Sequence, residues 1–128
     1  MISSKIAFIL ILSFFSIVFI QSGLDKVFDR KGNLSFLNDL LGGVFHRKLI
    51  NIAFITVTVL ELSSGFLCLA GVFDSFLRGS NSMGLVGLII GSIALLVLLF
   101  GQRVSKNYEG AKTITIYFIL SIIGVLLF

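Results

Sequence analysis

Four long apolar segments alternate with short polar segments along the chain. They are predicted as helices over residues 6–28, 49–73, 83–101 and 111–128. Because a helix rises about 1.5 Å per residue, about 20 residues cross a hydrocarbon layer about 30 Å thick. The first apolar run, Ile6–Ile20, is shorter than this, so we expect its helix to continue towards Phe28. No small-residue cleavage site follows it, which favours a retained span over a signal peptide.

A shorter amphipathic segment lies between the first two spans. It follows an expected turn over residues 29–33, and its apolar residues recur at helical spacing: Leu34, Leu37, Leu40, Leu41, Val44 and Phe45. Polar residues lie between them, and the segment of about a dozen residues is too short to cross a membrane. The pattern predicts an interfacial helix over residues 34–45, with Leu37, Leu41 and Val44 turned towards the rest of the protein.

Composition supports an integral membrane protein with a single domain over residues 1–128. Hydrophobic residues make up 57% of the 128 residues and charged residues only 12%. Soluble domains carry about twice that share of charge, and a domain this small cannot bury the apolar excess internally. The predicted fold class is therefore an all-α integral membrane protein. We expect a four-transmembrane-helix bundle with one short amphipathic interfacial helix after the first span.

The positive charges predict how the chain crosses the membrane. The net charge is +4; five Lys and Arg residues lie between Lys26 and Lys48, and three between Arg103 and Lys112. In a four-span protein these two segments lie on the same side, and the opposite side carries only Lys5 and Arg78. The positive-inside rule then places the two charged segments in the cytoplasm. Clustered cations beside spans indicate topology and lipid contact, so no nucleic-acid partner is expected.

Glu61 is the only formally charged residue in the second predicted span, and it lies near the middle. An acidic residue at the centre of a bilayer costs roughly 2.5–3.5 kcal/mol on insertion scales, so it indicates a partner or a function. Thr58, Gly65 and Cys68 fall on the same helix face as Glu61. Lipid would not satisfy such a polar face, so we expect it to pack against protein.

Candidate partners of Glu61 come from two other segments. Lys26 follows the first span closely, and its four methylene groups could carry the ammonium several ångströms into the membrane. Tyr117 belongs to a polar stripe on the last span, and Gln21 precedes Lys26 by five residues. We hypothesise a buried polar pocket formed by Lys26, Glu61, Tyr117 and Gln21. In the alternative, Lys26 is an interfacial anchor and Glu61 only fixes helix packing.

Small residues predict where the helices approach one another. Gly87 and Gly91 stand four apart on the third span, and Gly65 lies on the polar face of the second. Such spacing is typical of close helix–helix contacts in membranes.

The chain has few residues that could bind a metal ion or carry thiol chemistry. His46 is the only histidine and Cys68 the only cysteine, so we expect neither a metal site nor a thiol relay within this chain.

Several short motifs resemble those of the DoxX family, in the wider DoxD-like group of small four-span membrane proteins. Gly23-Leu24-Asp25-Lys26 is similar to the family's Gly-x-x-Lys, and Glu61-Leu-Ser-Ser-Gly65 is similar to its Glu-x-x-Gly-Gly, with Gly71 ending that helix. Residues 101–111, GQRVSKNYEGA, resemble a loop of many bacterial members. Ser64 replaces the first glycine of the Gly pair, and the arginine often found early in the first helix is missing. The resemblance implies the bacterial inner (cytoplasmic) membrane, and some relatives belong to quinone-reducing or oxidative-stress complexes.

These observations predict an accessory subunit of a membrane redox or quinone-linked complex, associated with other membrane subunits and not catalytic on its own. The chain lacks haem-ligand pairs, cysteine clusters, phosphate loops and a nucleophile–base pair, so we expect no catalytic residue and no intrinsic cofactor. A quinone head group could be oriented by Glu61. The alternative is a structural or assembly subunit of another envelope complex. A small transporter is less favoured, because neither inverted repeats nor broken helices are evident.

Overall fold

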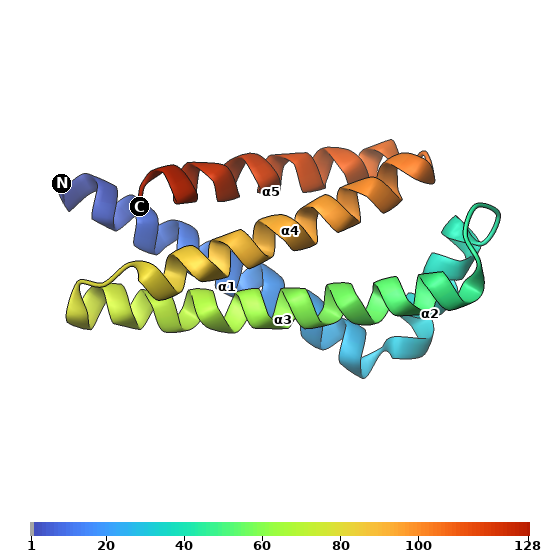
Figure 1. Cartoon of the computed structure of the whole chain (residues 1–128), viewed down its shortest axis with the longest axis horizontal. Coiled ribbons are helices and arrows are strands. Elements are labelled where there is room, and N and C mark those ends of the chain that lie inside the picture. The colour runs from blue at the N-terminus through green and yellow to red at the C-terminus, as the bar shows by residue number, and fades with distance from the viewer. Residues whose placement is uncertain (1) are drawn as a thin grey trace.

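The computed structural model describes residues 2–128, and over these it is all-helical, with five helices and no strand. The helices are α1 (Ile2–Phe28), α2 (Arg30–Leu41), α3 (Arg47–Arg78), α4 (Ser82–Val104) and α5 (Tyr108–Leu126). All except α2 are long and apolar enough to cross a membrane, which suggests a multi-pass membrane protein. Figure 1 shows the four long helices side by side, with α2 at one end.

The long helices begin and end beyond most of the predicted limits. α3 extends through the charged residues at both its ends, and α1 begins at Ile2 rather than near Ile6. Hydropathy marks only the apolar part of a helix, whereas backbone hydrogen bonding continues into polar sequence until a cap or turn stops it. For α3 these stops are His46, whose Nδ1 accepts a hydrogen bond from the Lys48 N–H, and left-handed Gly79.

The turn expected over residues 29–33 is nearly absent, because α2 begins at Arg30. Asp29 caps the helix, with its carboxylate accepting a hydrogen bond from the Gly32 N–H at 3.3 Å. The Asn33 amide donates to the Asp25 carboxylate at 3.2 Å and to the Asp29 carbonyl at 2.8 Å. These bonds attach the first turn of α2 to the end of α1.

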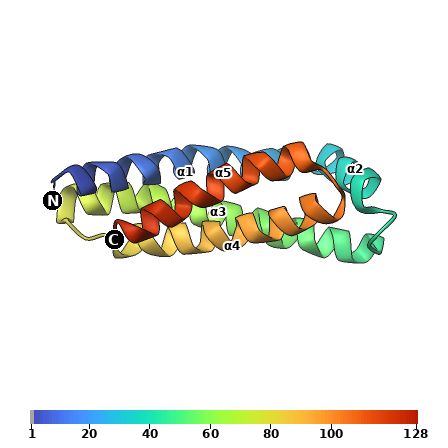
Figure 2. The same ribbon diagram turned by 90° about the horizontal axis from the view of Figure 1, so that it is seen from above.

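α3 lies at the centre of the packing. It packs along both α1 and α4, while α5 packs mainly on α4 (Figure 2). The core is a row of α1 side chains, Phe8, Leu12, Phe15 and Phe19, against Cys68, Leu88 and Leu95. Many large apolar side chains remain exposed on the outer faces of the long helices. This is the distribution expected where lipid covers the outside.

Glycines bring α3 close to its neighbours. A Cβ atom built on Gly71 would lie 2.5 Å from the Gly84 Cα, so α3 and α4 meet there backbone to backbone. On the other side, a Cβ on Gly65 would lie 2.9 Å from the Ile20 backbone nitrogen. A Cβ on Gly23 would lie 2.6 Å from the Leu62 side chain. The contacts of Gly65 and Gly23 fix the register between α1 and α3.

That register places the end of α1 beside the middle of α3. Gly23 packs on Leu62, and α1 ends at Phe28, whereas α3 starts at Arg47. By these residue numbers α3 extends about ten residues, or ~15 Å, further than α1 at this end. α2 lies alongside α3 where α1 has ended (Figure 2). The space for a site at this end therefore arises from the difference in helix length.

Candidate functional site

Lys26 and Glu61 form an ion pair between α1 and α3. The ammonium nitrogen lies 2.9 Å from Glu61 Oε1, and the two side chains are 16% and 2% exposed. The same ammonium donates a hydrogen bond of 2.8 Å to Ser22 Oγ, one turn earlier on α1. Lys26 also lies in the last turn of α1, where the helix dipole favours a positive charge. The cation is therefore held inside the bundle rather than at its surface.

Glu61 Oε1 has no directional hydrogen bond in the described part of the chain, although it is buried. Its close polar contact is the ion pair with the Lys26 ammonium, at 2.9 Å. An ionised carboxylate can accept about four hydrogen bonds. Glu61 therefore keeps unused acceptor capacity inside the bundle, where its side chain is only 2% exposed.

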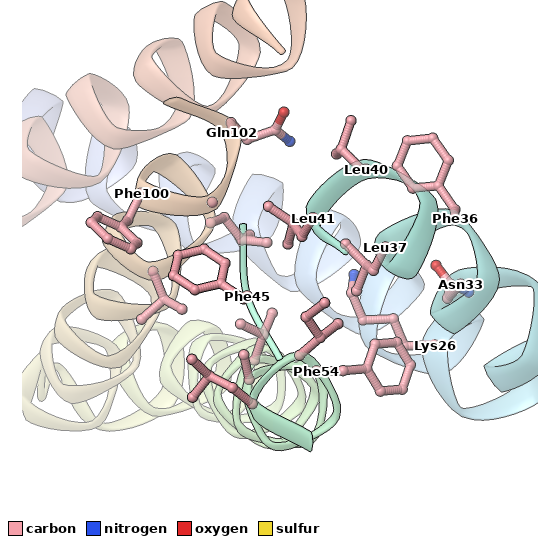
Figure 3. A pocket seen from close by; sticks show the side chains of 17 residues that line it. Lys26, Asn33, Phe36, Leu37, Leu40, Leu41, Phe45, Phe54, Phe100 and Gln102 are labelled. Atoms are coloured by element: carbon pink, nitrogen blue, oxygen red, sulfur yellow. The ribbon is translucent and has the colours of Figure 1, made fainter. Parts of the chain in front are cut away.

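A cavity of about 360 Å³ lies beside this pair, beneath α2 (Figure 3). Its wall comes mainly from α2, the first half of α3 and the end of α4, with one residue from α1 and one from the α2–α3 connection. The lining residues are Lys26, Asn33, Phe36, Leu37, Leu40, Leu41, Phe45, Leu49, Ile50, Ala53, Phe54, Val57, Val97, Leu98, Phe100, Gly101 and Gln102. Val57 is one turn before Glu61, so the cavity lies next to the ion pair. The volume is within the range of small-molecule sites, about 300–1,000 Å³.

The polar groups of the cavity are few. Only Lys26, Asn33 and Gln102 contribute polar side chains, and Asn33 already donates to α1 and Asp29. Gln102 Oε1 is buried without a hydrogen-bond partner among the described residues. Because Glu61 balances the charge of Lys26, the cavity presents little net charge. This arrangement suits a neutral, mainly apolar molecule with one or two polar groups.

Two residues of the predicted polar pocket lie elsewhere, and that part of the prediction is corrected. Gln21 is exposed; it precedes Lys26 by five residues and so projects about 0.4 of a turn away from it. Tyr117 contacts Phe14, with ring centroids 5.7 Å apart. Phe14 is twelve residues before Lys26, or ~18 Å along α1. Tyr117 therefore packs nearer the N-terminal half of α1, away from the ion pair.

The predicted packing glycines lie at helix contacts. Gly65 meets the α1 backbone at Ile20, and Gly87 meets Cys68, with 2.9 Å between its added Cβ and the Cys68 nitrogen. Gly91 lies against Phe19 and Ser64. Ser64 also donates a 2.7 Å hydrogen bond to the Gly87 carbonyl. Ser64 thus joins α3 to α4.

The amphipathic helix is only partly as predicted. Leu37 and Leu41 line the cavity, but Val44 lies beyond the end of α2 and is 56% exposed. The prediction for Val44 is wrong because α2 ends at Leu41, and the turn that follows removes Val44 from the helical face. Sequence reasoning also missed Gln102 and Phe45 as cavity residues. Gln102 gave no signal beyond its position beside a span, and the helical spacing that includes Phe45 does not show which helices meet there.

No group of three His, Cys, Asp or Glu side chains in residues 2–128 could hold a metal ion. Comparison of the chain with protein-family models, curated proteins and solved structures returned no match. The resemblance to the DoxX family therefore rests on the short motifs alone.

Proposed function

We propose that this chain is a four-span bundle of the bacterial inner membrane, with α2 at the interface, and an accessory subunit of a quinone-linked redox complex. The observation that carries the proposal is the Lys26–Glu61 ion pair beside an apolar cavity of about 360 Å³. The DoxX-like motifs are a second, weaker support, since Lys26, Glu61 and Gly65 occupy their motif positions.

A quinone head group has the chemistry that this cavity suits. It is neutral, flat and mainly apolar, and its carbonyl oxygens accept hydrogen bonds from an ammonium or an amide. Lys26 and Gln102 are the candidate donors. Glu61 does not line the cavity, so it would act on the quinone through Lys26, whose charge it balances. The chain itself would bind and orient the quinone, and electrons would come from a partner subunit.

The test is quinone retention by the full chain purified from native membranes, together with identification of its copurified subunits. We expect one quinone per chain in the wild type and at least a tenfold loss in Glu61→Leu. Glu61→Gln should assemble normally but bind or exchange quinone less well. Wild-type retention in both variants, at normal protein levels, would contradict the proposal.

A structural or assembly subunit is the second candidate function. The observation that favours it is the close backbone contact of α3 with α1 and α4. The Lys26–Glu61 ion pair would then serve only to hold α1 against α3. In that case Glu61→Gln keeps protein level and complex assembly, since glutamine preserves size and hydrogen bonding. Copurification of a complex with no redox component would support this second function.

A further inference from the structure

A polar groove of about 480 Å³ lies on the other face of α2. It is lined by Lys31, Leu34, Ser35, Asn38, Asp39 and Arg47. The first five belong to α2 and recur at helical spacing, and Arg47 is the first residue of α3. α2 thus separates two sites, because its apolar face covers the cavity while its polar face forms this groove.

Cations without an ion-pair partner among the described residues line the groove or are adjacent in sequence to residues that line it. Arg30, Lys31, Arg47 and Lys48 are exposed, and none of them forms an ion pair within residues 2–128. Two of the four, Lys31 and Arg47, face the groove from different helices. Ser35 has no hydrogen bond among the described residues, and Asn38 uses one amide hydrogen on the Leu34 carbonyl. Both can therefore donate to a ligand.

We propose that this groove binds the phosphodiester of an anionic phospholipid. Arg47 supplies a guanidinium that can hold two phosphate oxygens, Lys31 a point charge, and Ser35 a neutral donor. Large apolar side chains border the same end of the molecule, with Val44 and Leu49 both more than half exposed. In the membrane placement proposed above, these side chains meet acyl chains while the cations lie at the head groups, so the ligand is a lipid rather than free phosphate.

The proposal does not depend on quinone binding, because Lys31 and Arg47 do not line the cavity. Asp39 is the one acid in the groove, and its charge opposes an anionic ligand. This gives the site a signature that a purely structural groove lacks. Removing the acid should strengthen lipid binding, and removing the cations should weaken it.

The experiment titrates the full chain, purified in detergent, with phosphatidylglycerol and with phosphatidylcholine, and counts bound lipid by native mass spectrometry. We expect selective retention of phosphatidylglycerol, weakened about tenfold to thirtyfold in Lys31→Gln/Arg47→Gln and strengthened about threefold in Asp39→Asn. The matched control is Lys106→Gln/Lys112→Gln, which removes one charge from the α4–α5 connection and one from the start of α5, at the same end (Figure 1). That control should retain lipid within threefold of the wild type.

Three results would overturn the proposal. These are equal binding of both lipids, an equal loss in the control pair, and displacement of phosphatidylglycerol by an equal concentration of glycerol phosphate. The last would show that a soluble phosphate is the ligand. Loss of quinone with retained phosphatidylglycerol, or the reverse, would separate this site from the cavity.

Discussion

Lys26 reaches Glu61 across the interface between α1 and α3, with 2.9 Å between the ammonium nitrogen and Oε1. The contact exists because α1 ends beside the middle of α3. A lysine near the end of one helix thereby lies level with an acid at the centre of the other. Removing both charges from water costs free energy that largely offsets their attraction, so the pair contributes little net stability. Its presence inside the bundle therefore indicates a candidate binding site.

Removal of one partner should destabilise the bundle more than removal of both. Lys26→Met leaves Glu61 buried and unpaired, and we expect a loss of roughly 3 kcal/mol in the free energy of unfolding. Lys26→Met/Glu61→Leu should recover most of that loss, because both charges are replaced by apolar groups. A double-mutant cycle from unfolding in detergent measures the coupling. Additive effects of the two single substitutions would show that the ion pair contributes nothing.

Gly71→Ala should destabilise the contact between α3 and α4. The added Cβ would lie 2.5 Å from the Gly84 Cα, and a backbone atom cannot move aside as a flexible side chain can. Overpacking of this kind costs about 1–3 kcal/mol. The control is Gly101→Ala, a helical glycine of α4, where an added Cβ meets nothing within 4 Å. Thermal unfolding should show a lower midpoint for Gly71→Ala only, and equal midpoints would refute the close approach.

Ser64→Ala removes the 2.7 Å hydrogen bond to the Gly87 carbonyl. Hydrogen bonds between helices in membrane proteins average about 0.6 kcal/mol, so we expect a small loss of stability. Thr56→Val is a suitable comparison, since the Thr56 hydroxyl bonds only to the Ile52 carbonyl of its own helix. Unfolding in detergent should give Ser64→Ala a lower free energy of unfolding than Thr56→Val. The opposite order would be inconsistent with a hydrogen bond between helices.

Ala53→Phe should fill part of the cavity and reduce quinone retention about tenfold or more. Ala53 lines the cavity, whereas its neighbour Ile52 is 55% exposed and does not. Ile52→Phe therefore places the same aromatic side chain on the outer face and should leave retention unchanged. Quinone is extracted from each purified variant and quantified. If Ala53→Phe lowers protein level, Val57→Ala, which enlarges the cavity, provides the second measurement and should change the preferred ligand size.

The length and apolar character of the segments were enough to predict an all-helical chain with four long helices, because these properties follow from composition along the sequence. The single formal charge in residues 49–73 likewise identified Glu61 as a residue that needs a partner. Both inferences use local physical chemistry: the rise of a helix and the desolvation of a charge.

Which residues meet Glu61 was decided by the tertiary structure. The contacts of Gly23 with Leu62 and of Gly65 with Ile20 set the register of α1 on α3, and that register brings Lys26 to Glu61. Tyr117 instead packs on Phe14, which lies about 18 Å along α1 from Lys26. The end of α2 at Leu41 likewise removed Val44 from the packed face. The cavity could not be predicted from one segment, because it is the volume left where α1 is shorter than α3 and α2 covers the difference.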